Sequence, residues 1–189
     1  MRRQSLGVKT DQILVIKFPG PTEGMKTKME SMRRAIKKLP LASKVTCSGA
    51  VPGEEVAMFL SNHRAHDALK QNRLYEMLSC DPDYIDAYGL EVVAGRGFSE
   101  EYGDDVNKLV INETAARMLG YVDNDDAIGE EIAVETLGEP MQVIGVVKDY
   151  HQQALNKGYT GVMLFHKDKI DWIPQRYISV VMKPGDPSE

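Results

Sequence analysis

The chain has 189 residues, of which 42% are hydrophobic and 27% are charged, and this fits one globular domain or two small lobes. Its formal net charge of −5 argues against a nucleic-acid partner, because nucleic acids select basic surfaces. No run reaches the roughly 18 apolar residues that a membrane helix needs. The segment Met1–Gly7 lacks the apolar core of a secretory signal.

The N-terminal part is predicted to form a β–α–β unit. Gln12–Phe18 is nearly all apolar, which is typical of a strand buried on both faces. Met25–Leu39 places apolar residues at spacings of three and four, which predicts an amphipathic helix that stops at Pro40. Its methionines are favoured as core residues over soft-metal ligands. Lys44–Ala50 is the second predicted strand, and such a unit commonly has two parallel strands with the helix across one face.

The two cysteines, Cys47 and Cys80, lie 33 positions apart and do not form a metal-binding framework. One disulfide and two buried free thiols are both open alternatives. Free thiols are favoured, because unpaired cysteine is a common core residue.

Two histidines lie in a segment that the pattern leaves unassigned. Val56–Leu60 is a short strand candidate, and Ser61–Arg73 follows it without a clear period. His63 and His66 have the spacing at which two histidines on a helix can share a metal. Because no third ligand is evident, an exposed loop is favoured over a metal site.

A strand over Leu74–Cys80 is predicted to lead into a short helix that ends near Gly89. Asp81 is the predicted N-cap, and Pro82 fits the first helical position. The residues of this helix that are predicted to face the core are Tyr84, Ile85 and Tyr88.

The next segments are predicted to be a short strand over Leu90–Val93 and several turns. Gly95–Phe98 does not fit a phosphate loop, because no helix start with a Lys-Ser/Thr pair follows it. The acidic segments Glu100–Asp105 and Asp123–Asp126 lack the alternating carboxylates and fixed glycine of a calcium loop. Solvated turns are therefore predicted for both.

The best-marked local structure is a strand over Lys108–Ile111 that turns directly into a short helix over Asn112–Gly120. Asn112 is a good N-cap, because its side-chain oxygen can accept a backbone N–H of the first turn. Glu113 and Arg117 complement the helix dipole, and Gly120 can adopt the left-handed conformation that ends a helix. The motif is architectural, because it places no nucleophile beside a base.

The C-terminal half is predicted to consist mainly of strands. Ile128–Val134 and Met141–Val147 are joined by a hairpin turn at Gly138–Pro140. Gly161–Phe165 is a further strand, and Arg176–Met182 is the last. Because no helix follows the last strand before the chain ends, it resembles the start of an unfinished β–α–β unit.

One pair of residues suggests catalysis. Asp149 and His151 alternate along a strand end and could serve as orienter and base. The sequence places no serine, threonine or cysteine nucleophile beside them, so catalysis is disfavoured. No catalytic, metal-binding or cofactor-binding residue is predicted, and no cofactor is expected.

The ordered set of motifs resembles the extracytoplasmic domain of MacB/FtsX-type ABC transporter permeases, in the style found in Bacteroidetes. The resemblance covers nearly the whole chain except Ser61–Arg73. The motifs that carry it are Leu6-Gly7, Asp11–Lys17, Val51–Gly53, Asp81–Tyr84, Tyr88–Leu90, Val93–Phe98, Val110–Arg117, Ala127–Gly129 and Val143–Asp149.

The resemblance implies an α+β fold with two lobes, a β–α–β porter lobe and an inserted mixed α/β sabre lobe. Residues 1–52 would form the first porter unit, residues 53–168 the sabre lobe, and residues 169–189 the truncated start of the second porter unit. The chain would then be a fragment, with the rest of that unit and the membrane helices outside it.

The resemblance also implies a non-enzymatic function at the periplasmic side of the inner membrane. Such a domain couples cytoplasmic ATP hydrolysis to export or periplasmic work by rigid-body motion. Its implied partners are a cytoplasmic ABC ATPase and a second permease copy, with a periplasmic adaptor or other periplasmic protein as a further candidate. The isolated domain is expected to be a monomer or weak dimer. The alternatives are a module that binds a small molecule or peptide between two lobes, and an enzyme that uses Asp149 and His151.

Overall fold

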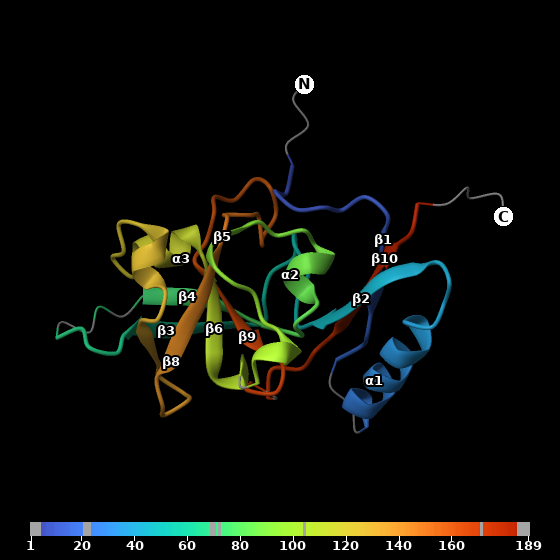
Figure 1. Ribbon diagram of the computed structural model, residues 1–189, viewed down its shortest axis with the longest axis horizontal. Coiled ribbons are helices and arrows are strands. Elements are labelled where there is room, and N and C mark those ends of the chain that lie inside the picture. Colours follow the sequence, from blue (N-terminus) through green and yellow to red (C-terminus); the bar gives the residue numbers. More distant parts are fainter. Residues whose placement is uncertain are drawn as a thin grey trace.

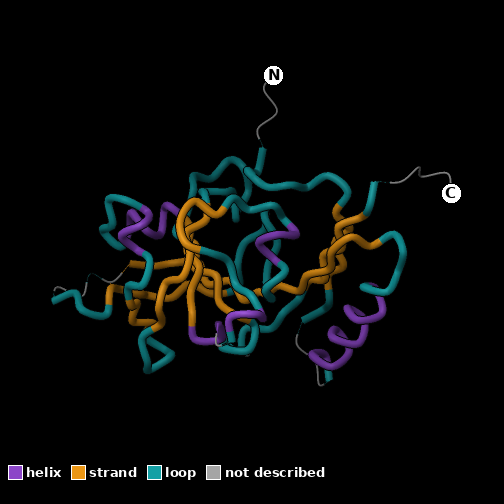
Figure 2. Tube along the Cα trace, in the orientation of Figure 1, coloured by secondary structure: helices purple, strands orange, loops and turns teal. Residues whose placement is uncertain are grey.

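The computed structural model describes residues 5–20, 24–68, 71, 73–103, 105–170 and 172–184. Several predicted segments lie partly outside these ranges: the N-terminal segment, the unassigned segment 61–73, the acidic turn 100–105 and the closing turn after Met182. Figure 1 shows an elongated molecule in which a strand-rich body lies beside a smaller unit that carries the helix α1. Figure 2 shows that strands make up most of the regular structure and that the longest helix lies at one end of the molecule.

The smaller unit has three strands and one helix. Its strands are β1 (Ile13–Lys17), β10 (Tyr177–Met182) and β2 (Ala42–Ser48), and its helix is α1 (Met25–Ile36). β10 lies between β1 and β2 and is antiparallel to both, so β1 and β2 run in the same direction without touching. The predicted β–α–β order is therefore confirmed, but the two parallel strands are not neighbours.

β1 corrects one expectation from the sequence. The run Gln12–Phe18 was expected to be buried on both faces, but Leu14 is 55% exposed and Val15 42% exposed. The reason is topological, because β1 pairs only with β10 and lies at one end of the strand order. An apolar run alone does not distinguish such an edge strand from a central one.

Six strands of the larger unit close into a barrel. Their order is β4-β3-β7-β8-β6-β9, and β9 returns to pair with β4 in parallel. The bounds of these strands are β3 Met58–Arg64, β4 Arg73–Cys80, β6 Lys108–Asn112, β7 Glu131–Val134, β8 Met141–Val147 and β9 Val162–His166. A seventh strand, β5 (Val92–Gly95), pairs with β8 outside the ring.

Alternate residues of the barrel strands form its core. Because successive side chains of a strand point to opposite faces, every second residue belongs to one cluster. This cluster contains, among others, Tyr75, Met77, Leu109, Ile111, Ile132, Val134, Met141, Val143, Met163 and Phe165. The intervening residues join a second cluster under the short helix α2 (Tyr84–Ala87), and α1 covers a third cluster on β2 and β10.

The strand that leads into the capped helix agrees with the prediction. β6 leads directly into α3 (Glu113–Met118), and the Asn112 side chain accepts a hydrogen bond from the Ala115 backbone N–H at 2.9 Å. Gly120 has a φ of +91°, which is the left-handed conformation expected at the helix exit. The acidic segments form short 3-10 helices over Glu100–Tyr102, Asp105–Asn107 and Asn124–Ala127.

The segment left unassigned by the sequence begins inside a strand. β3 extends to Arg64, so His63 is a strand residue, while His66 follows in a turn. The spacing of these histidines is therefore not helical. His66 Nε2 lies 3.4 Å from a Glu131 carboxylate oxygen at the surface. Within the described ranges, no three His, Cys, Asp or Glu side chains are placed to hold a metal ion.

Candidate functional site

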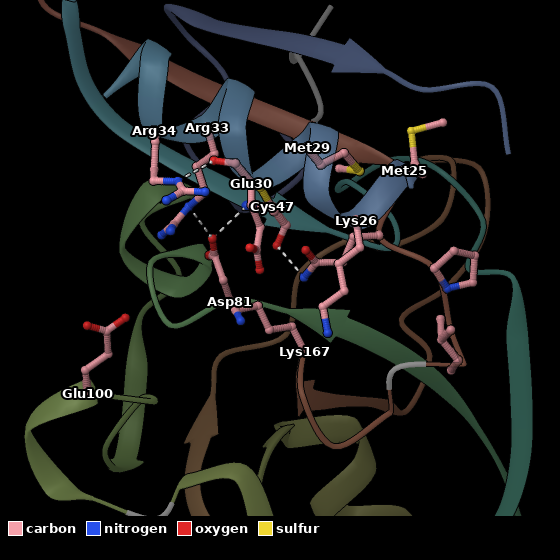
Figure 3. A pocket seen from close by; sticks show the side chains of 13 residues that line it. Met25, Lys26, Met29, Glu30, Arg33, Arg34, Cys47, Asp81, Glu100 and Lys167 are labelled. Atoms are coloured by element: carbon pink, nitrogen blue, oxygen red, sulfur yellow. Dashed lines mark hydrogen bonds and ion pairs between the residues drawn. The ribbon is translucent and has the colours of Figure 1, made fainter. Parts of the chain in front are cut away.

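A cleft of about 460 Å³ lies between α1 and the barrel. Figure 3 shows the helix along one side of the cleft, with Lys26, Glu30 and Arg33 pointing toward the Asp81 and Lys167 side. The residues that line it are Met25, Lys26, Met29, Glu30, Arg33, Arg34, Cys47, Asp81, Glu100, Lys167, Ile173, Pro174 and Gln175. The cleft therefore has apolar residues between charged groups of both signs.

A buried carboxylate closes one end of the cleft. Asp81 is 1% exposed and accepts hydrogen bonds from the Thr46 hydroxyl and, at 2.9 Å, from the Cys47 backbone N–H. Arg33 Nε approaches the same carboxylate at 3.1 Å. Burial raises the pKa of Asp81, and the Thr46 hydroxyl and the Arg33 charge oppose that rise. Asp81 therefore fastens α1 and β2 to the barrel.

The structure corrects the capping role predicted for Asp81. The N-cap position of α2 is Asp83, and no side chain makes a cap hydrogen bond there. Asp83 instead pairs with Arg33 at 2.8 Å and with Lys37 at 2.7 Å. The helix is only one turn long. The Asp81 and Asp83 carboxylates therefore bind the Cys47 N–H and the Arg33 guanidinium across the interface, and not the N–H groups of α2. The predicted exit at Gly89 is confirmed by its φ of +60°, and Tyr84, Ile85 and Tyr88 are buried.

The other end of the cleft has an exposed ion-pair cluster. The Asp168 carboxylate lies 2.8 Å from Lys167 Nζ and 3.6 Å from Lys26 Nζ. Lys26 is on α1, and Lys167 and Asp168 follow β9, so the Lys26–Asp168 pair joins the smaller unit to the barrel. Its side chains are 67% and 41% exposed, and an ion pair in that setting contributes at most about 1 kcal/mol.

The two cysteine thiols are unpaired, and their positions explain why. Cys47 belongs to the cluster under α1, whereas Cys80 belongs to the cluster under α2, so the two side chains point to opposite faces of the sheet. The favoured prediction of buried free thiols is confirmed. Burial raises the pKa of the Cys47 thiol to about 12, so this cleft residue is not a thiolate nucleophile near neutral pH.

Asp149 and His151 do not form a catalytic pair. The Asp149 carboxylate accepts hydrogen bonds from Asn112 Nδ2 at 2.9 Å, Thr114 N–H at 2.8 Å and the Thr114 hydroxyl at 2.9 Å. Arg117 also donates to it at 2.6 Å. The His151 ring instead lies against the Tyr159 ring, 4.6 Å between centroids. Asp149 therefore holds the start of α3 rather than orienting a base.

The cleft was not predicted from the sequence. Arg33 and Asp81 lie 48 positions apart in the sequence. The available signal was an Asp-Pro-Asp run directly after a strand, together with two adjacent arginines on a helix. Nothing in the spacing of these residues indicates that they meet.

The fold is similar to those of two solved extracytoplasmic domains. The periplasmic region of MacB from Actinobacillus actinomycetemcomitans has a TM-score of 0.64 and 18% identity, with 96% of this chain and 79% of that chain covered. The extracellular domain of the noncanonic ABC-type transporter YknZ from Gram-positive bacteria has a TM-score of 0.61 and 18% identity, with 91% and 83% covered. No curated protein matches the chain significantly. The fold is that of extracytoplasmic domains of ABC-type transporters.

The family is shown by the sequence itself. The family of MacB-like periplasmic core domains matches residues 3–189, and the chain belongs to this family. It is therefore a periplasmic domain of the kind found in MacB-like transporter permeases, as the sequence resemblance implied. Among the described residues, none of the helices has the length and apolar character required to cross a bilayer.

Proposed function

We propose that this domain transmits motion from the membrane to the periplasm as a rigid lever. In this role it has no catalytic activity of its own. A cytoplasmic ABC ATPase supplies the energy, the membrane helices of the permease move, and this domain moves with them relative to a second permease copy. An adaptor or another periplasmic protein receives the displacement.

The observation that carries this proposal is the way in which the two units are joined. β2 and β4 share one bridge, Ser48 opposite Cys80, with backbone hydrogen bonds on both sides of it. Arg33 meets Asp81 on the α1 side, and the Tyr88 hydroxyl lies 2.7 Å from Ser179 Oγ in a buried contact. These links between the two units support the proposal, because a lever must move as one body.

We also propose the lobe boundaries given above for the porter and sabre lobes. β1, α1 and β2 lie in the proposed first porter unit, the barrel lies within residues 53–168, and β10 lies in residues 169–189. β1 has a described partner on one side only and exposes Leu14 and Val15. Another strand that pairs along this edge would complete the proposed porter lobe.

Distance measurements on the full-length permease with its ATPase test the lever. Spin labels are placed at two exposed positions, Lys28→Cys on α1 and Val122→Cys in the turn after α3 of the larger unit. Both native cysteines are buried, so the labels react with the introduced cysteines. Lys28→Cys alone reports the distance between two permease copies. The double variant, diluted into unlabelled permease, reports the distance within one copy. We expect ATP to change the first distance and to leave the second unchanged. A change of similar size within one copy would contradict a rigid lever.

A cross-link provides the second arm of the test. Ser48 and Cys80 are a non-hydrogen-bonded antiparallel pair, whose Cα atoms typically lie about 4.5 Å apart, within disulfide range. Ser48→Cys should therefore pair with Cys80 on oxidation. We expect the ATPase rate of the transporter to be the same before and after oxidation, with Ser48→Ala as the control. A loss that a reductant reverses would favour a binding module that must open between its lobes.

A further inference from the structure

The cleft between α1 and the barrel has the dimensions and lining of a ligand site. Its volume of about 460 Å³ lies within the range of small-molecule pockets. Its apolar surface comes from Met25 and Met29 on α1 and from Ile173 and Pro174 on the opposite wall. Methionine side chains adapt to ligands of varied shape. An apolar body therefore fits between these walls.

Two lysines at the cleft provide cationic partners for an anion. Lys26 and Lys167 come from opposite walls, and their ammonium groups already meet on one carboxylate, that of Asp168. Glu30 lines the same cleft on the α1 wall and would repel a second anion, and Glu100 lies further away, on the barrel side (Figure 3). An oxyanion group of a ligand would take the place of the Asp168 carboxylate on these lysines.

The two ends of the cleft differ in how easily they open. Asp81 and Arg33 form a buried contact, and separating them would leave a desolvated carboxylate. The Lys26–Asp168 pair is exposed and 3.6 Å long, so Lys26 can exchange Asp168 for another anion at little cost. A ligand can therefore enter at the lysine end while the arginine end keeps the units together.

We propose that this cleft binds an amphipathic anion. The ligand has an alkyl or aryl body that lies over Met25, Met29 and Ile173, and a carboxylate or phosphate head that lies between Lys26 and Lys167. This inference goes beyond the lever role and does not depend on it. The chemistry is shared by a free amphiphile and by the head and tail of an anionic lipid.

The test uses the single tryptophan of the chain as its reporter. Trp172 is 45% exposed and adjoins Ile173 in the cleft wall. The 189-residue chain is titrated with decyl phosphate below its micelle concentration, by tryptophan fluorescence and by calorimetry. Inorganic phosphate tests the head alone, and decyl maltoside tests the tail alone. We expect saturable binding of decyl phosphate and at least tenfold weaker binding of either control.

Charge variants assign the site. Lys26→Gln with Lys167→Gln should weaken binding of decyl phosphate about tenfold, because two attractive contacts are lost. Glu30→Gln should strengthen it about threefold, because a like charge is removed. Lys28→Gln with Lys38→Gln is the control: it removes the same charge as the first pair, but from two residues that do not line the cleft. It should leave the affinity for decyl phosphate unchanged. Equal losses in both lysine pairs, or no response to Glu30→Gln, would overturn the proposal.

A vesicle arm distinguishes the two sources of the ligand. Phosphatidylglycerol vesicles are mixed with the same variants and sedimented. Co-sedimentation that requires Lys26 and Lys167 assigns the head group to a membrane lipid, and binding of monomeric decyl phosphate alone assigns it to a free amphiphile. Failure of both arms in the folded wild-type chain would overturn the proposal. The distance measurements on the permease are unaffected by that result.

Discussion

Individual polar residues in this domain act by joining segments that are distant in the sequence. Asp149 follows β8 and yet receives hydrogen bonds from Asn112 and Thr114 at the start of α3. In return, the Glu113 carboxylate accepts a hydrogen bond from the Asp149 backbone N–H at 3.0 Å. The residue that the sequence offered as a catalytic candidate is thus part of a reciprocal cap. Carboxylates at a helix start are well placed for this, because the backbone N–H groups there have no partners within the helix.

Glu76 gives a prediction at the residue scale. This carboxyl on β4 is 1% exposed and accepts a hydrogen bond from Gln153 Nε2. Burial raises its pKa, against the effects of Gln153, Thr160 and Lys157, while Glu55 adds to the rise. A raised pKa means that the folded state holds the proton more tightly than the unfolded state. Glu76 therefore makes folding less favourable as the pH rises through its folded pKa.

We expect Glu76→Gln to gain stability relative to the wild type as the pH rises from the ordinary glutamate pKa of about 4.3 into the neutral range. The substitution removes the group that must ionise in the core, and all other titrating groups are common to both proteins. Urea unfolding at several pH values gives the difference in free energy of unfolding. A difference that stays constant across this range would contradict the assignment. Glu139→Gln is the matched control, because Glu139 is exposed and does not contribute to the shift of Glu76.

At the scale of elements, β5 and the Arg96 residue that follows it lie very close to β8. This close approach depends on two glycines. A Cβ at Gly145 on β8 would lie 2.0 Å from the Arg96 carbonyl oxygen, and one at Gly95 would lie 2.2 Å from the Ile144 carbonyl oxygen. Arg96 in turn forms two hydrogen bonds of 2.7 Å with the Asp105 carboxylate. The position of the segment after β5 therefore requires the absence of side chains on both sides.

Gly145→Ala should destabilise the domain by about 2–4 kcal/mol, because backbone must move to admit the methyl group. Gly158→Ala is the matched control, since nothing lies within 4 Å of a Cβ there, and it should change stability by less than about 0.5 kcal/mol. Urea unfolding measures both. Equal effects of the two substitutions would show that the contact between the Arg96 segment and β8 is not as close as described.

The sequence predicted the elements well and their assembly poorly. The strand over β4, the passage from β6 into α3 and the hairpin of β7 and β8 follow from alternation, capping and turn residues close together in the chain. The burial of β1 was wrong because it depends on a strand about 160 residues away. Closure of the barrel by β4 and β9, and the meeting of Arg33 with Asp81, are likewise contacts between distant segments that no local pattern encodes.

At the scale of the whole molecule, the contact between the smaller unit and the barrel relies on charged groups as well as on apolar packing. Arg33 is the central residue, since it reaches the buried Asp81 and the more exposed Asp83. Removing one member of such a pair leaves the other desolvated, whereas removing both does not. A double-mutant cycle can therefore separate the free energy of the Arg33–Asp81 ion pair from that of the surrounding apolar packing.

Arg33→Met should destabilise the domain by about 2–3 kcal/mol and speed hydrogen exchange of the α1 amides. Adding Asp81→Asn should recover part of that loss, because the unpaired charge is gone. Lys44→Met removes an exposed pair with Asp86 and should cost less than about 1 kcal/mol. If Arg33→Met lowers the free energy of unfolding no more than Lys44→Met does, the Arg33 ion pairs do not hold the two units together.

The position of β10 between β1 and β2 sets an order of events during synthesis. β1 ends at Lys17 and β2 ends at Ser48, but the strand that joins them begins only at Tyr177. During synthesis, which begins at the N-terminus, the first two strands emerge well before the residues that must pair between them. Contacts of such long range form slowly and leave strand edges open in the meantime. The first segment to arrive is thus the last to be completed.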